Sequence, residues 1–142
     1  MTKKYKILAQ FIKDMSSETP DIDTFIFVKD NIANYSLDID IKSKAVKNKI
    51  IQVETTLGYS DKSNNNKKKS FFEMIYVTMV RLDDDVNEKN DLARIILCDL
   101  QNEIYPELEK IFLNMLHGSG YPELNFTKKV DFEELYKKKK IQ

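Results

Sequence analysis

Few residues in this sequence could carry out nucleophilic or acid–base chemistry. The chain of 142 residues contains one histidine, His117, and one cysteine, Cys98. A nucleophile needs a base within hydrogen-bond distance and a third group that orients the base. His117 stands beside Gly118 at a predicted helix end, where a positive side chain interacts favourably with free carbonyls. Cys98 falls in a helical pattern and is typical of a small packing residue, so we expect no catalytic site.

The sequence also lacks the patterns of metal and nucleotide sites. Asp83, Asp84, Asp85 and Glu88 offer oxygen ligands, but without the ligand spacing and glycine of a calcium loop. An acidic turn before a helix explains them better. One histidine and one cysteine cannot build a zinc site, and the chain has neither a GxxxxGK[ST] nor a GxGxxG loop. We expect no cofactor and an activity independent of nucleotides.

Composition narrows the class of protein further. Lysine plus arginine and aspartate plus glutamate are 23 each, so the formal net charge of +0 favours neither nucleic acid nor an anionic membrane as partner. Polar residues interrupt the amino-terminal segment before it reaches the length of a signal-peptide core, and all apolar runs are too short to cross a bilayer. These observations predict one globular, cytoplasmic domain that does not insert into membranes.

The elements that would position any site begin with four predicted strands. Apolar residues alternate with polar ones in Tyr5–Met15, Tyr35–Ile41 and Lys49–Tyr59, and Phe71–Leu82 is rich in β-branched and aromatic residues. One face of the first strand would carry Tyr5, Ile7, Ala9, Phe11 and Met15. The polar segment Asp61–Lys69 predicts a hairpin loop between the last two strands.

Two helices are expected after the strands. Apolar residues recur at steps of three and four over Leu92–Met115, and Pro106 predicts a kink at Ile104–Tyr105. Gly118 and Gly120 would end this helix. A short last helix, capped by Asp131, would place Phe132, Leu135 and Tyr136 on one side.

Strands followed by helices predict an α+β fold. We expect a four-stranded antiparallel sheet with the long kinked helix and the short C-terminal helix on one face. The connection between the first two strands is too long for a tight hairpin, so the second strand would cross over the sheet. Residues 1–136 would form the domain, and residues 137–142 a flexible lysine-rich tail.

Apolar residues also stand in segments predicted to be loops. Phe25–Val28 fall between the first two strands, and Tyr121, Leu124 and Phe126 follow the long helix. Loops usually lie at the surface. These residues either seal the domain's own core or an oligomer interface, or they form the walls of a hydrophobic groove for extended polypeptide with the sheet as floor.

Three segments together resemble one family, the SecB protein-export chaperones. The first is Phe11–Pro20, an aromatic residue followed by Lys-Asp, Ser, Glu and Pro at the family's spacing. The second is Tyr121–Phe126 with Val130–Tyr136, which is similar to the family's loop and last helix. The third is Ile104-Tyr105-Pro106, where the family breaks its long helix. Their order and separation match along nearly the whole chain.

The resemblance implies an ATP-independent cytosolic holdase. It would bind unfolded secretory precursors, keep them competent for translocation and deliver them to the motor ATPase SecA. The assembly would be a homotetramer, built as a dimer of dimers. The implied precursor groove consists of Phe25, Phe27, Tyr121, Leu124, Phe126, Phe132 and Leu135. Asp14, Glu18, Phe71 and Glu73 fall at positions that dock the motor, and strand alternation puts Phe71 and Glu73 on one face.

Other functions remain open at this point. The same fold could serve as a chaperone dedicated to a toxin–antitoxin pair. The apolar loops could instead make the chain a noncatalytic subunit of a permanent oligomer. A small-molecule enzyme is a further alternative. Capture of several unrelated unfolded precursors would separate the general chaperone from each of these.

Overall fold

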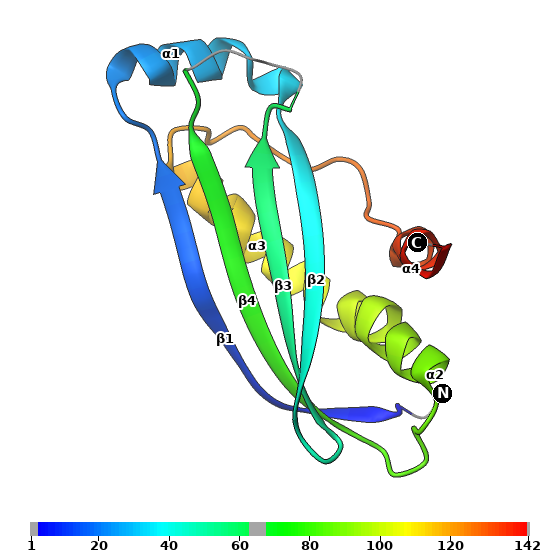
Figure 1. The fold of residues 1–142 in the computed structure, drawn as a ribbon. Helices are drawn as coiled ribbons and strands as arrows, with labels where there is room; N and C mark the ends of the chain where they lie inside the picture. Colours follow the sequence, from blue (N-terminus) through cyan, green and yellow to red (C-terminus); the bar gives the residue numbers. More distant parts are fainter. Residues whose placement is uncertain (1–2, 63–67, 142) are drawn as a thin grey trace.

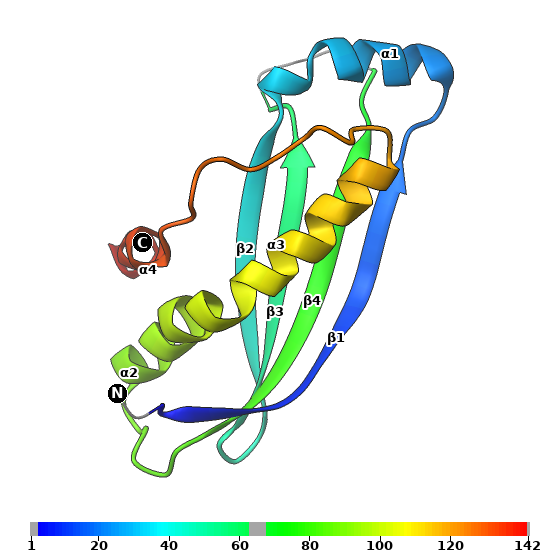
Figure 2. The same ribbon diagram turned by 180° about the vertical axis from the view of Figure 1, so that it is seen from behind.

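The computed structural model describes residues 3–62 and 68–141 and has one antiparallel sheet with helices on one face. The strands are β1 (Tyr5–Glu18), β2 (Ser36–Lys47), β3 (Ile50–Ser60) and β4 (Phe71–Leu82), in the order β1-β4-β3-β2 (Figure 1). The long helix α3 (Leu100–Gly118) lies across one face (Figure 2), and no helix of the described residues lies over the other face. The predicted fold class is therefore confirmed.

The connection from β1 to β2 passes over one end of the sheet, as expected, because these strands form its two edges. It is not a loop, however, so the loop prediction for Phe25–Val28 is wrong. Helix α1 (Ile22–Asp30) and the short 3-10 helix η1 (Ile32–Asn34) occupy it. The Asp21 carboxylate caps α1 by accepting a hydrogen bond from the Thr24 amide at 2.8 Å. Thr24 and Val28 are its buried residues, one helical turn apart.

Strands β2 and β3 follow the predicted alternation, whereas β1 does not. In β3, Ile51, Val53 and Leu57 face α3 and are buried. In β1, irregularities lie between Ile7 and Ala9 and between Ile12 and Asp14. Each bulge adds a residue and exchanges the two faces of the strand. Phe11 consequently points to the opposite face from Ile7, so the prediction of one continuous apolar face on β1 is wrong.

The long helical region changes its geometry earlier than predicted. It begins as α2 (Lys89–Arg94), continues through the π-helical turn η2 (Ile95–Asp99) and then becomes α3, whose direction differs from that of α2 (Figure 2). Pro106 lies inside α3, which runs without interruption past the predicted break at Ile104–Tyr105. Pro106 is exposed, so its ring and the missing donor fall on the solvent side.

The carboxy-terminal part follows the predicted order. Helix α3 ends at Gly118, and Gly120 has a φ of 115°, which favours glycine. An extended connection then leads to α4 (Phe132–Ile141), where the Glu134 amide donates to the Asp131 carboxylate at 3.2 Å. The predicted boundary between residues 136 and 137 falls inside this helix, and the flexibility of the tail stays a prediction. In the part of the chain described, no helix is long and apolar enough to cross a membrane.

The core lies between α3 and the sheet. Leu57, Met74, Leu108 and Phe112 are fully buried there. One polar contact is buried with them: the Gln101 amide donates to the Thr55 hydroxyl at 2.9 Å, and both side chains are completely enclosed. A paired buried polar group costs less free energy than an unpaired one, so this bond favours the observed position of α3 along β3.

Candidate polypeptide-binding and docking surfaces

An aromatic cluster closes the core at the end of the sheet nearest α1. One member, Phe25, lies on α1. Tyr35 directly precedes β2, Tyr59 lies on β3 and Phe72 on β4. Tyr121 and Phe126 lie in the connection after α3. The Phe72 ring centre lies 5.9 Å from that of Tyr121, and the Tyr59 ring centre lies 5.6 Å from that of Phe126. Burial raises the pKa of the Tyr35, Tyr59 and Tyr121 phenols, so the cluster is uncharged at neutral pH.

Three of the residues predicted to line a groove meet at the edge of this cluster. Phe25 of α1 packs on Tyr121 with ring centres 5.5 Å apart. Beside them, Tyr121 and Leu124 line a hollow of about 440 Å³ together with Lys29 and Ile32. The remaining lining residues are Gly120, Pro122 and Glu123. This opening therefore lies between α1 and the connection after α3.

Phe27 and Phe126 belong to the same region but are only half-buried. Phe27 lies on α1, where its carbonyl accepts a hydrogen bond from the Asn31 amide side chain at 2.8 Å. Phe126 is sandwiched between Tyr59 and Phe112, and its ring is nearly parallel to that of Phe112, with centres 6.5 Å apart. These ring contacts hold the connection against the core, and part of the Phe126 side chain stays accessible.

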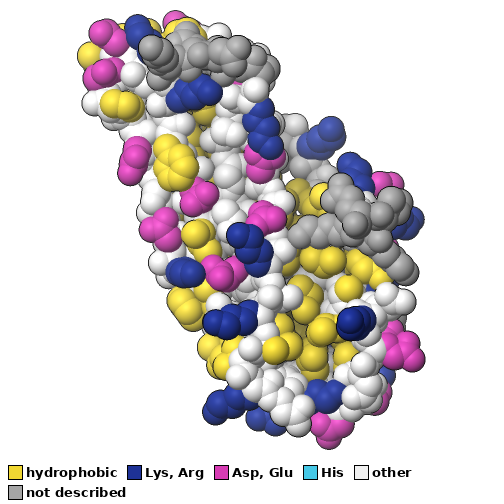
Figure 3. All heavy atoms as spheres, in the orientation of Figure 1, with side chains coloured by type: hydrophobic (Ala, Val, Ile, Leu, Met, Phe, Trp, Pro, Cys, Tyr) yellow, Lys and Arg dark blue, Asp and Glu magenta, His cyan; other side chains and the backbone are white. Residues whose placement is uncertain are grey.

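Phe132 and Leu135 lie apart from the other predicted groove residues, on α4. Phe132 is buried against Tyr105 with ring centres 5.2 Å apart. Leu135 lines a second, smaller hollow of about 80 Å³ beside the β2 edge, with Ile39, Ile41 and Leu97. Apolar side chains gather between the β2 edge of the sheet and the helices beside it (Figure 3). The predicted residues therefore form two apolar areas, at the α1 end and under α4.

Sequence reasoning did not assign Ile39, Ile41 or Leu97 to a binding surface. The alternation of β2 identifies Ile39 and Ile41 as apolar residues on one face. Nothing in that pattern says that β2 is an edge strand, so the accessible side of these residues could not be predicted. Leu97 lies in the π turn η2, which a helical period does not anticipate.

Polar contacts hold α4 over this second area. Arg94 of α2 forms an ion pair with Glu133, and its guanidinium lies 5.9 Å from the centre of the Tyr136 ring. The hydrogen bond from Arg94 lowers the pKa of the Glu133 carboxyl. Both charged partners are exposed, so this attachment is weak compared with a buried contact.

The four residues predicted to dock the motor lie together on the sheet face opposite α3, which we call the outer face. Glu18 pairs with Phe71 across β1 and β4, and Ser16 pairs with Glu73. Asp14 is on the same face, opposite Ile75. Directly opposed residues project to the same side of a sheet. Phe71 is 48% exposed, which leaves an apolar ring among carboxylates.

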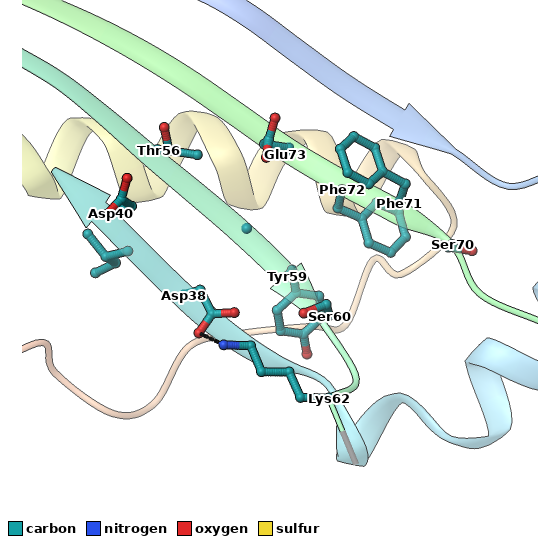
Figure 4. Close-up of a pocket in the computed structure, with 12 residues that line it drawn as sticks. Asp38, Asp40, Thr56, Tyr59, Ser60, Lys62, Ser70, Phe71, Phe72 and Glu73 are labelled. Carbon is teal, nitrogen blue, oxygen red and sulfur yellow. Dashed lines mark hydrogen bonds and ion pairs between the residues drawn. The ribbon is translucent and has the colours of Figure 1, made fainter. Parts of the chain in front are cut away.

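A hollow of about 420 Å³ adjoins Phe71 and Glu73 on the outer face. Asp38 and Asp40 of β2 line its other side, and the Lys62 ammonium forms an ion pair with Asp38 at 2.8 Å (Figure 4). The sequence analysis did not include these two aspartates. Their alternation with Ile39 predicts that they lie on the solvent-exposed face of the strand. Their proximity to Glu73 of β4 could not be predicted, because it depends on the strand order.

The residues considered for chemistry have structural contacts. His117 Nε2 donates to the Leu124 carbonyl at 2.7 Å, which ties the connection to the end of α3. Burial raises the pKa of the Cys98 thiol, so it stays protonated at neutral pH. Asp85 forms an ion pair with Lys4 at 2.7 Å. Among the residues that the structure describes, no histidine, cysteine and carboxylate side chains gather as a metal site.

Comparison with known proteins identifies the family. The family model described as preprotein translocase subunit SecB matches residues 1–142. The chain belongs to the SecB family. A relative from Pelagibacter ubique that carries the SecB name is 56% identical over 139 residues, covering 98% of this chain and 99% of the relative. The protein-export protein SecB of a Bradyrhizobium strain is 27% identical and covers 92% of this chain and 78% of its own length.

A solved structure shares the SecB fold. It is a SecB-like chaperone of Mycobacterium tuberculosis in complex with a peptide from an antitoxin, with a TM-score of 0.60. It covers 89% of this chain and 91% of its own, at 12% sequence identity. The resemblance predicted from the three sequence segments is thus confirmed, both for the family and for the fold.

Proposed function

We propose that this SecB-family chain is an ATP-independent, noncatalytic holdase of the cytoplasm. It captures unfolded secretory precursors and delivers them to SecA. The observation that carries the proposal is the pair of apolar areas, one beside the aromatic cluster and one under α4. Each accessible apolar side chain of a client that is buried there contributes about 1.5 to 3 kcal/mol. A protein that binds only unfolded chains lowers the apparent stability of its clients by mass action.

Client capture is tested by placing a charge in the first apolar area. Leu124→Glu and Phe126→Glu should weaken capture of a denatured precursor about tenfold or more, because a carboxylate must then be desolvated in the contact. Asn90→Glu is the control for the added negative charge, since Asn90 is exposed on α2, away from this area. Loss of capture in all three variants, or unfolding with binding intact, contradicts the assignment of the groove.

The range of clients separates a general export chaperone from a dedicated one. Titration calorimetry or native mass measurement with three unrelated unfolded precursors should show binding to each. A chaperone for one toxin–antitoxin pair would bind only the antitoxin segment, and a noncatalytic structural subunit would bind none of them. Capture of all three supports the role in export.

We also propose that the protein forms a tetramer, a dimer of dimers. Strand β1 is an edge strand with exposed apolar residues on both of its faces, Phe11 on the outer face and Ile12 and Met15 on the other. Pairing with a second β1 would satisfy its free backbone groups and cover these residues. Sedimentation should give a tetramer at micromolar concentration, and Ile12→Lys should dissociate it. A wild-type monomer would contradict this.

We propose the outer-face residues Asp14, Glu18, Phe71 and Glu73 as the SecA contact. Glu73→Lys should weaken SecA binding and leave precursor capture unchanged, because it turns attraction for a basic partner into repulsion. Raising the salt concentration should reduce the difference. Asp84→Lys makes the same change of charge at an exposed position outside this face. Equal loss in both variants, or loss of precursor capture alone, would remove Glu73 from the docking contact.

A further inference from the structure

The charges on the outer face are separated along the strands. In the pairing across the sheet, Asp38 and Glu73 share a row near the α1 end, and Asp40 and Asp14 share the next row on this face. From Lys42 onward the sign reverses on β2, with Lys44 and Lys47 following. Most carboxylates of the outer-face rows therefore lie toward the α1 end, and Glu54, opposite Lys42, is the carboxylate among the basic rows.

The last rows bring cations together from three strands. Lys47 of β2 is opposite Ile50 of β3, Ile50 is opposite Arg81 of β4, and Arg81 is opposite Lys6 of β1. Lys44 and Lys42 lie on β2 in the next two rows toward the middle of the sheet. We call this group the basic end, and its members are Lys6, Lys42, Lys44, Lys47 and Arg81. All five are exposed.

The cations of the basic end differ from their neighbours in having no acidic partner. Lys3, Lys4 and Lys13 are each in an ion pair with a carboxylate, and Lys49 donates to the Val86 carbonyl and to Asn87. Within residues 3–62 and 68–141, no carboxylate lies within ion-pair distance of any member of the basic end. Glu54 stands nearby on β3, opposite Lys42, but is paired with Lys13 at 3.0 Å. These charges are therefore available to an external anion.

We propose that the basic end is a docking site for an acidic, extended polypeptide segment of a partner or client. Lys42 and Lys44 stand two residues apart on one strand face, about 7 Å along the strand. That is also the spacing of alternate side chains on an extended chain, so carboxylates two residues apart can face both ammonium groups. Charge complementarity supplies the attraction, and the strand spacing supplies the register.

A polypeptide fits this surface better than an anionic membrane. A flat bilayer laid against the outer face would also meet Asp14, Glu18, Asp38, Asp40 and Glu73, which repel anionic lipid. A single chain segment can lie on the basic rows without approaching these five carboxylates, and Glu54 in the Lys42 row is already paired with Lys13. The site is separate from the proposed SecA contact, so either can fail without the other.

The test uses a fluorescent 12-residue peptide of alternating glutamate and serine, with an alternating lysine and serine peptide as its counterpart. The acidic peptide should bind the wild-type protein, and Lys44→Glu/Lys47→Glu should weaken binding about tenfold or more. Binding should also fall as salt is raised. Lys89→Glu/Lys128→Glu makes the same change in net charge at exposed positions elsewhere and should bind like the wild type.

Three results would overturn the proposal. One is that the wild-type protein does not bind the acidic peptide. Another is that both double variants lose binding equally, which would make the effect one of net charge. The third is that vesicles containing phosphatidylglycerol bind through Lys44 and Lys47 and the acidic peptide does not. Precursor capture measured in parallel reports separately on the groove.

Discussion

Gly120→Ala should destabilise the protein by displacing Phe25 from the aromatic cluster. A Cβ at position 120 would lie 2.4 Å from Cε1 and 2.9 Å from Cζ of the Phe25 ring. Position 120 also has a φ of 115°, where an L-residue costs about 1 to 2 kcal/mol. Overpacking typically adds about 1 to 3 kcal/mol. Because Phe25 is half-buried and its ring can move outward, we expect a total loss near the lower end, about 2 to 3 kcal/mol.

Urea unfolding followed by circular dichroism measures this loss. Gly118→Ala is the matched control, because a Cβ there meets no atom within 4 Å and the position is helical. Alanine should stabilise that site by up to about 1 kcal/mol. Adding Phe25→Ala to Gly120→Ala removes the steric clash and leaves the backbone cost. If Gly120→Ala unfolds at the wild-type urea concentration, the close packing of Phe25 on the connection is wrong.

Three further changes test other contacts. Arg94→Ala should speed hydrogen exchange throughout α4 and raise the pKa of Glu133, because the ion pair is lost; unchanged exchange would mean that Phe132 alone holds the helix. Hydrogen bonds from Tyr5 and Lys3 lower the pKa of Glu103, so the folded carboxyl resists protonation and stability should fall as pH drops below about 5, less steeply in Glu103→Gln. Pro106→Ala should raise the thermal unfolding temperature, because α3 is already continuous there; a lower temperature would contradict this.

The strands that the sequence predicts best are those with neighbours on both sides. In β3, every second residue from Ile51 to Tyr59 is buried, which matches the predicted alternation. Such a strand has one face under α3 and continuous pairing, so burial and period agree. The predicted alternation is wrong for β1, because two bulges each exchange the faces to which the following residues point. A bulge leaves little signal in composition.

The helical region shows a related difference. A period of 3.6 residues predicts α3 and its buried residues Ile104 and Leu108. It cannot predict a π turn, which inserts one residue and shifts the apolar side of α2 relative to α3. The break predicted from Pro106 is absent. The effect of a proline depends on whether its side of the helix is packed or exposed, and Pro106 is on the exposed side.

The arrangement of the candidate site residues could not be predicted from the sequence, and their role in binding stays a prediction. The aromatic residues of the connection and of α1 could be identified because apolar side chains there had no role in a strand or a long helix. Their separation from Phe132 and Leu135 follows from the path of the connection to α4, which no local pattern encodes. The outer-face rows likewise depend on strand order, since Asp38 and Glu73 become neighbours only through β3.

The strand order also constrains how the chain folds during synthesis. β1 leaves the ribosome first, yet it pairs only with β4 among the described strands, so it must wait until residues 71–82 have been made. The β2–β3 hairpin is local and can form in the meantime. During that interval Phe11, Ile12 and Met15 stand on an unpaired strand. The nascent chaperone therefore resembles the unfolded, apolar segments that it is proposed to capture, and completed copies could bind it.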